Sequence, residues 1–179
     1  MSDDVSLDKN GIYLLMGSIS TETVQPVIDF ILKNEFYEEP FVELKLFINS
    51  NGGSLTDAFA LIDVMKGSTS KISTVGIGEV SSAGLDIFMA GTKGRRILTP
   101  NTSILSHQYS WGTWGKEHEL FAAKKGYDLT TKQRMSHYKK CTGLSEKKIR
   151  EILLPPEDVW LSAAEALEYG ICDDVKGKY

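Results

Sequence analysis

Residues 71–91 read KISTVGIGEVSSAGLDIFMAG, a strand-like run that passes directly into a short helix-like run. The β-branched, glycine-bounded residues 71–78 predict a buried strand, and the apolar residues 82–91 predict a short helix. Two adjacent serines, Ser81 and Ser82, stand at the junction, between Gly78 and Gly84. The same strand-to-helix order recurs along the chain, so this stretch is typical of the expected fold.

The remaining pattern predicts an α/β domain with helices packed on largely parallel strands. A long helix is expected over 117–141, interrupted at Gly126 and ended by Gly143. The other expected strands cover residues 11–19, 41–49, 95–98, 102–107 and 171–175, and the other helices cover 20–35, 55–67, 145–153 and 162–170.

Composition excludes several classes of protein. The 179 residues fit one domain, and the net charge of −4 without a basic face argues against nucleic acid as a partner. The acidic, polar start lacks the features of a secretory signal, and no stretch is long and apolar enough to span a bilayer, so a cytoplasmic protein without membrane association is expected.

Cysteine usage predicts neither a disulfide framework nor a metal site. Cys141 and Cys172 are too few to staple a domain of this size, so both are expected to be reduced. His137 and Cys141 share one helix face at metal-ligand spacing, but no second pair of ligands accompanies them, and no metal is expected.

Two interpretations of Ser82 remain open at this point. A serine where a strand passes into a helix is usually a helix cap. A nucleophilic serine instead needs a tight junction that exposes its oxygen, small neighbours and the positive end of a helix dipole, and GEVSSAG (78–84) supplies all three.

A nucleophilic serine also needs a base, and the chain has three histidines. His118 and His137 fall in the long helix and are expected to be solvated. His107 ends the strand over 102–107 next to a loop, where catalytic residues are often held. A half-buried histidine satisfied by backbone groups is the alternative for His107.

Three motifs together are similar to those of the Clp protease proteolytic subunit (ClpP) family. They are TVGIGEVSSAG (74–84), RILTPNTSILSHQ (96–108) and INSNGGS (48–54), and the resemblance runs from about Ile12 to Val175. It implies a ClpP/crotonase-like superhelix of repeated β-β-α units in a single domain over 1–179. That domain would have a short N-terminal segment over 1–10 and a protruding helix-strand handle at about 108–143.

The resemblance also implies the roles of five residues. Ser82 corresponds to the nucleophile, His107 to the general base, and Asp158 to the acid that orients the imidazole. The backbone N–H groups of Gly53 and Ala83 correspond to the oxyanion hole, where a glycine allows close backbone approach.

Asp158 has two rivals, Asp173 and Asp174, and its own alternative is an ordinary surface carboxylate. Asp158 follows from anchoring the resemblance on LSAAEALEYG (161–170), although LLPP (153–156) looks like an insertion that would shift this register. Family positions that are usually alanine, apolar and proline hold Val80, Ser106 and Tyr109 here, which alters the shape of the pocket more than its chemistry.

The implied function is a serine endopeptidase that hydrolyses unfolded polypeptides inside a chamber of stacked heptameric rings, without metal or organic cofactor. Its implied partner is a AAA+ unfoldase ATPase. Because only ten residues precede Gly11, docking and pore gating are expected to differ from those of the family. Residues 108–120 are expected beside the substrate, with Trp111 and Trp114 equally suited to anchor an interface.

Three other functions are alternatives to this one. A crotonase-type acyl-CoA hydratase or isomerase shares the fold and the oxyanion hole but does not need a serine, histidine and aspartate in this order. A non-catalytic structural subunit usually lacks triad residues, whereas all three candidates are present here. A membrane-bound serine-lysine peptidase would need an anchoring segment.

Overall fold

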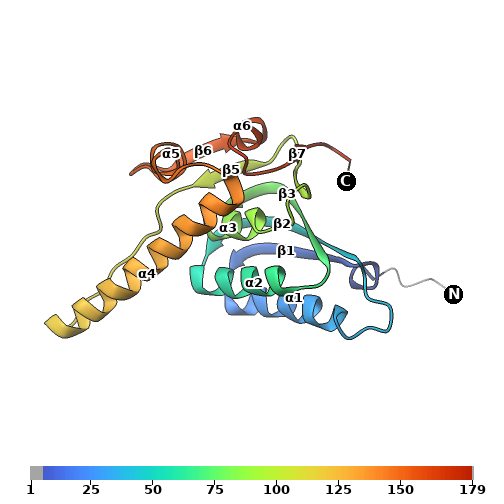
Figure 1. Ribbon diagram of the computed structural model, residues 1–179, viewed down its shortest axis with the longest axis horizontal. Coiled ribbons are helices and arrows are strands. Elements are labelled where there is room, and N and C mark those ends of the chain that lie inside the picture. Colours follow the sequence, from blue (N-terminus) through green and yellow to red (C-terminus); the bar gives the residue numbers. More distant parts are fainter. Residues whose placement is uncertain (1–5, 179) are drawn as a thin grey trace.

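Three strand-and-helix units make up the N-terminal half of the chain (Figure 1). The computed structural model describes residues 6–178 of the 179. A single helical turn, η1 (Asp8–Asn10), precedes the three units. The units are β1 (Ile12–Ile19) with α1 (Thr21–Asn34), β2 (Glu43–Gly53) with α2 (Leu55–Gly67), and β3 (Lys71–Ser81) with α3 (Ala83–Met89). The predicted order of strands and helices is confirmed.

Each long strand has two segments, because the strand pairing shifts register midway. The shift falls between Met16 and Ser18 in β1 and between Ile48 and Ser50 in β2. The first segment of β3 pairs in parallel with β4 (Arg96–Leu98), and the second pairs in parallel with β5 (Ser103–Ser106). Two strand segments and one helix per unit form the expected β-β-α repeat.

The sheet of the described residues runs in the order β1-β2-β3-β4-β7, in which β7 is the short strand Asp174–Val175, and β5 joins it through β3. Helices α1 and α2 lie side by side below β1 in Figure 1. Along β2 every second side chain, including Leu44, Leu46 and Ile48, is fully buried. Burying one such aliphatic side chain stabilises the folded state by roughly 1.5–3 kcal/mol. A shift of the strand by one residue would expose all of them, so this alternation specifies the strand register.

The C-terminal half contributes one long helix and several short elements. Helix α4 (Glu117–Thr142) packs its C-terminal part against the body, and its N-terminal part projects away from it (Figure 1). The remaining elements are α5 (Glu146–Lys148), the π-helical turn η2 (Ile149–Leu153), β6 (Val159–Ser162), α6 (Ala163–Glu168) and β7 (Asp174–Val175). None of the helices within residues 6–178 combines the length and hydropathy needed to cross a bilayer.

The expected interruption of the long helix at Gly126 is wrong. Helix α4 runs through Gly126, since an isolated glycine costs a helix only about 1 kcal/mol and the neighbouring turns hold it in register. The predicted end is confirmed, because Gly143 adopts a left-handed conformation (φ 77°) and its N–H bonds the carbonyl of Lys139.

The strand expected in the handle is not formed. Residues 107–116 lead into α4 but adopt neither helix nor strand. Gly112 and Gly115 lie in this segment, and glycine weakens a strand because it has more backbone entropy to lose. Within the described residues the projecting handle therefore consists of α4 and the irregular segment 107–116, the strap.

Candidate active site

Ser82 occupies a strained position between β3 and α3. Its backbone has φ 52° and ψ −122°, and it is the one non-glycine residue with positive φ in the described part of the chain. Such a conformation costs about 1–3 kcal/mol and is typical of functional sites. Although Ser82 is the N-cap of α3, its side chain makes no capping hydrogen bond, so the helix-cap interpretation is not supported.

The oxygen of Ser82 instead faces His107. Ser82 Oγ lies 2.8 Å from His107 Nε2. The strand pairing explains this proximity: Ser81 and Leu105 are partners in the parallel ladder of β3 and β5. The residues that follow these partners leave the sheet at the same edge, and Ser82 N–H still bonds the carbonyl of Leu105 at 2.9 Å.

Asp158 lies on the other side of the His107 imidazole. Its Oδ1 is 3.3 Å from His107 Nδ1, and its side chain is 61% exposed. Strands β5 and β6 are antiparallel, with Ser106 opposite Val159, so the ladder continued by one residue sets His107 opposite Asp158. The structure thus brings together Ser82, His107 and Asp158, all three of which the sequence analysis singled out.

The two rival carboxylates lie elsewhere. Asp173 accepts hydrogen bonds from Arg96 Nε at 2.9 Å and from Arg96 Nη2 at 2.6 Å. Burial alone would raise the pKa of Asp173, but these bonds hold it well below its usual range. Asp174 lies in β7, which pairs with β4 rather than β5, and contacts Lys176 at 3.0 Å. Neither carboxylate is placed to orient His107.

In the glycine pair, Gly52 packs its backbone against Ser82 and Gly53 packs its backbone against Ile19. A Cβ on Gly52 (φ 93°) would lie 2.6 Å from Ser82 Cβ, and one on Gly53 (φ 147°) would lie 2.2 Å from the carbonyl oxygen of Ile19. Both positions therefore require glycine for conformation and for space. Ala83 begins α3, and N–H groups in the first turn of a helix have no acceptor within the helix.

Ser50 is a supporting residue to which the sequence analysis assigned no role. It is buried, and its Oγ accepts a hydrogen bond from Gly52 N–H at 3.1 Å. A Cβ on Gly84 would meet Ser50 Cβ at 2.8 Å, so Ser50 separates the glycine pair from the start of α3. Its position in INSNGGS was the only available signal.

A cavity of about 360 Å³ opens over Ser82 and His107. Gly53 also lines it, as do Tyr109 and Trp111 from the strap. The Tyr109 hydroxyl donates to the carbonyl of Tyr127 at 3.0 Å, which fastens the strap to α4. Two other cavities, of about 410 and 400 Å³, lie along the C-terminal half of α4 and include neither Ser82 nor His107.

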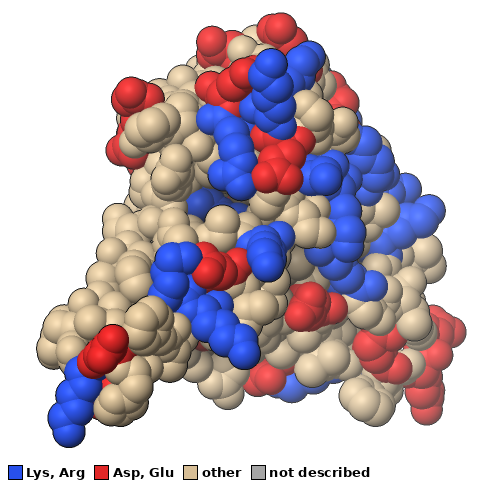
Figure 2. Space-filling view, turned by 60° about the vertical axis from the view of Figure 1, so that its left-hand side comes forward, with Lys and Arg blue, Asp and Glu red and all other residues tan. Residues whose placement is uncertain are grey.

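Figure 2 shows that lysines, arginines and carboxylates are interspersed on the face that this view presents. Lys132 and Lys140 line both of the cavities along α4.

His137 is a correction to the sequence analysis, which expected it to be solvated. It is only 3% exposed, and its Nε2 lies 2.8 Å from the carbonyl of Asp86. Burial lowers the pKa of His137. The prediction failed because α4 is exposed at its projecting end but buried where it crosses α3, and one helix-wide polarity could not describe both parts.

Cys141 Sγ lies 3.7 Å from His137 Nδ1. Residues 6–178 contain no group of three or more histidine, cysteine, aspartate or glutamate side chains that could hold a metal ion.

Known proteins that resemble this chain are proteases, which agrees with the geometry of Ser82, His107 and Asp158. The family model described as Clp protease matches residues 3–178. The chain is 35% identical to the ATP-dependent Clp protease proteolytic subunit 2 of Corynebacterium diphtheriae, over 77% of this chain and 68% of that protein. It is 33% identical to the ATP-dependent Clp protease proteolytic subunit 1 of Corynebacterium jeikeium, over 77% of this chain and 72% of that protein.

Proposed function

The chain belongs to the Clp protease family and is a serine-type peptidase, and from this premise we propose that Ser82, His107 and Asp158 form its catalytic triad. The observation that carries the proposal is the 2.8 Å distance between Ser82 Oγ and His107 Nε2. Hydrogen-bond reach between nucleophile and base is the first geometric requirement of such a site.

In the proposed reaction Ser82 Oγ attacks the carbonyl carbon of a peptide bond while His107 Nε2 takes the hydroxyl proton. Asp158 accepts from Nδ1–H, which fixes the tautomer whose Nε2 is free to act as base, and then stabilises the imidazolium. His107 returns the proton to the leaving amine. Water repeats the sequence on the acyl-enzyme and releases the acid.

Backbone N–H groups of Gly53 and Ala83 are proposed to bind the oxyanion. Support comes from the cavity that Gly53 shares with Ser82 and from the place of Ala83 at the start of α3. Losing one such donor typically costs about 3 kcal/mol of transition-state stabilisation, or roughly 100-fold in rate.

We also propose that the substrate is unfolded polypeptide and that cleavage occurs in an oligomeric chamber of stacked rings fed by an ATPase. The relatives are named as subunits of ATP-dependent proteases. The projecting part of α4 and the strap expose large apolar side chains, which suits burial against further copies of the chain: Trp111, Trp114, Leu120, Phe121 and Leu129.

The test is to treat the purified protein with a fluorophosphonate probe and map the adduct by mass spectrometry. A single adduct on Ser82, absent from heat-denatured protein and from a Ser82→Ala variant, is expected. Sedimentation of the same sample establishes whether rings have formed. The absence of an adduct on assembled protein would refute the triad and favour a non-catalytic subunit.

A further inference from the structure

A buried ion pair lies beside the proposed triad. Arg134 on α4 directs its Nε to Asp86 on α3, at 3.1 Å from Oδ2 and 3.3 Å from Oδ1. The side chains are 2% and 0% exposed. A buried pair of this kind gains little net stability over apolar residues of similar volume, because both charges lose their hydration. Stability alone therefore does not account for it.

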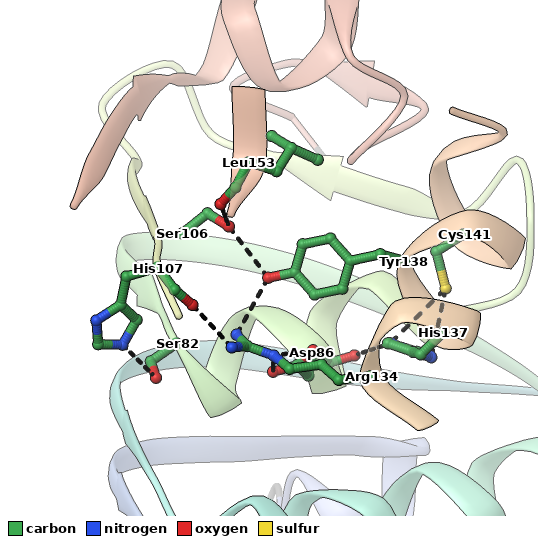
Figure 3. A network of polar contacts seen from close by, with 9 residues as sticks. All are labelled: Ser82, Asp86, Ser106, His107, Arg134, His137, Tyr138, Cys141 and Leu153. Atoms are coloured by element: carbon green, nitrogen blue, oxygen red, sulfur yellow. Dashed lines mark hydrogen bonds and ion pairs between the residues drawn. The ribbon is translucent and has the colours of Figure 1, made fainter. Parts of the chain in front are cut away.

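The same guanidinium also holds the backbone of the proposed base. Arg134 Nη1 donates to the carbonyl oxygen of His107 at 2.7 Å, the shortest hydrogen bond that the side chain makes (Figure 3). Strand pairing of β5 with β6 ends at Ser106 and Val159, so the carbonyl of His107 lies beyond the ladder. Arg134 thus supplies a fixed donor where the sheet ceases to do so.

A second branch of the network holds the residue before His107. Arg134 Nη2 donates to the Tyr138 hydroxyl at 3.2 Å, and that hydroxyl lies 3.1 Å from Ser106 Oγ. Ser106 Oγ in turn donates to the carbonyl of Leu153 at 2.5 Å. Burial raises the pKa of Tyr138 to about 12, so its hydroxyl keeps its proton across the working range of pH.

The residue at the other end of the ion pair lies in the helix that follows the nucleophile. Asp86 lies four residues after Ser82, and its N–H bonds the carbonyl of Ser82 at 3.1 Å. The Asp86–Arg134 pair therefore joins the helix that follows the nucleophile to the carbonyl group of the base, across segments that are far apart in the sequence.

We infer that Arg134, anchored by Asp86, is a positioning residue that holds the His107 imidazole within hydrogen-bond distance of Ser82 Oγ. This role rests on the proposed function, since it concerns the geometry of the proposed nucleophile and base. Arg134 bonds the backbone carbonyl of His107 and not its imidazole. It acts through the backbone of His107, and its loss lets the base drift while the substrate cavity keeps its lining.

The chain offers a matched control for a purely structural role. Arg96 is equally buried, is bound by both oxygens of Asp173, and donates from Nη1 to a backbone carbonyl, that of Cys141, at 2.9 Å. It makes the same kinds of bond as Arg134 but holds β4 to the end of α4 instead of holding His107.

The experiment compares two paired replacements in the full chain, Asp86→Leu with Arg134→Met and Asp173→Leu with Arg96→Met. Both remove a buried ion pair without leaving a buried lone charge, because Lys93, which also contacts Asp173 at 3.2 Å, is 70% exposed. Urea unfolding curves of each variant establish the conditions under which it is folded, and the activity assays are made there. Peptide hydrolysis then gives kcat and KM, and fluorophosphonate labelling gives the acylation rate of Ser82.

The Asp86 and Arg134 replacement is expected to lower kcat and the labelling rate at least tenfold with KM within about twofold, because a shift of about 1 Å in a reacting group can cost roughly 100-fold. The Arg96 and Asp173 replacement is expected to leave kcat within about threefold. Equal losses in the two variants, or a wild-type kcat in the first, would overturn the role of Arg134.

Arg134→Lys decides the matter if the paired replacement does not fold. Lysine keeps the charge beside Asp86, but its ammonium cannot serve Asp86, His107 and Tyr138 in one plane as a guanidinium does. A folded Lys variant with kcat reduced at least threefold supports the inference, and an unchanged kcat refutes it. Retained activity in Ser82→Ala would instead refute the proposed function, so the two failures are distinguishable.

Discussion

Replacing Gly52 by alanine is predicted to abolish most activity by displacing Ser82. The new Cβ would lie 2.6 Å from Ser82 Cβ and 3.2 Å from Ser82 Oγ. Carbon atoms in contact prefer about 3.5–4.0 Å, so one of the two backbones must move by about 1 Å. A displacement of that size at a reacting group costs roughly 100-fold in rate, or about 2.7 kcal/mol in the barrier.

Stability is predicted to fall as well, for two separable reasons. Gly52 has φ 93°, and an alanine held in that region is strained by about 1–3 kcal/mol. Overpacking adds about 1–3 kcal/mol. Gly17 is the matched control: its φ is 86°, and an added Cβ would meet nothing within 4 Å. Gly17→Ala should therefore show the strain without the collision.

The assay measures the unfolding free energy in urea together with kcat on a fluorogenic peptide and the fluorophosphonate labelling rate. Gly17→Ala is expected to lose stability but keep kcat within about twofold. Gly52→Ala is expected to lose more stability and about 100-fold in kcat. Equal kcat values in the two alanine variants would refute the collision argument.

Three further predictions concern titratable side chains, namely Asp158, Asp173 and His137. Asp158→Asn should lower kcat by orders of magnitude by favouring the wrong tautomer of His107, and near-normal hydrolysis by this variant would remove Asp158 from the triad. Arg96 lowers the pKa of Asp173, so the ionised Asp173 should stabilise the fold fully above about pH 4 and lose that contribution as the pH falls further. A difference in unfolding free energy between wild type and Asp173→Asn that stayed constant from pH 6 to 3 would contradict this. His137, whose pKa burial lowers, takes up a proton more readily when unfolded, so wild type should lose stability relative to His137→Phe as pH falls from 7.5 to 5.5, by up to about 1 kcal/mol per pH unit; parallel curves would count against a buried neutral His137.

The local order of the chain could be predicted because it depends on near neighbours. Alternating buried residues in β2 and the Ser54 cap of α2, whose Oγ accepts from Asp57 N–H at 3.2 Å, are both short-range features of the sequence. The motifs around Ser82 and His107 were equally visible, since each occupies one continuous stretch. The choice of Asp158 over Asp173 depended on register, which residue order alone left open.

The long-range features were not accessible in the same way. The sequence analysis gave no role to Asp86 or Arg134, 48 residues apart, because a charge inside a helix is usually solvated. It also took His137 as exposed and the handle as partly strand. Each of these errors concerns burial or pairing between distant segments, which no local period reports.

The order of strands and helices as far as β5, the glycines at the tight junctions and the candidate nucleophile and base could be predicted from the sequence, because they follow from local backbone sterics and side-chain chemistry. Strand β6 (Val159–Ser162), which follows Asp158 directly, was not expected. Which carboxylate lies beside the His107 imidazole, and which guanidinium bonds its carbonyl, depends instead on the packing of distant segments. The antiparallel register of β5 and β6 brings Asp158 to one side of the imidazole, and the crossing of α3 and α4 buries Arg134 behind its carbonyl.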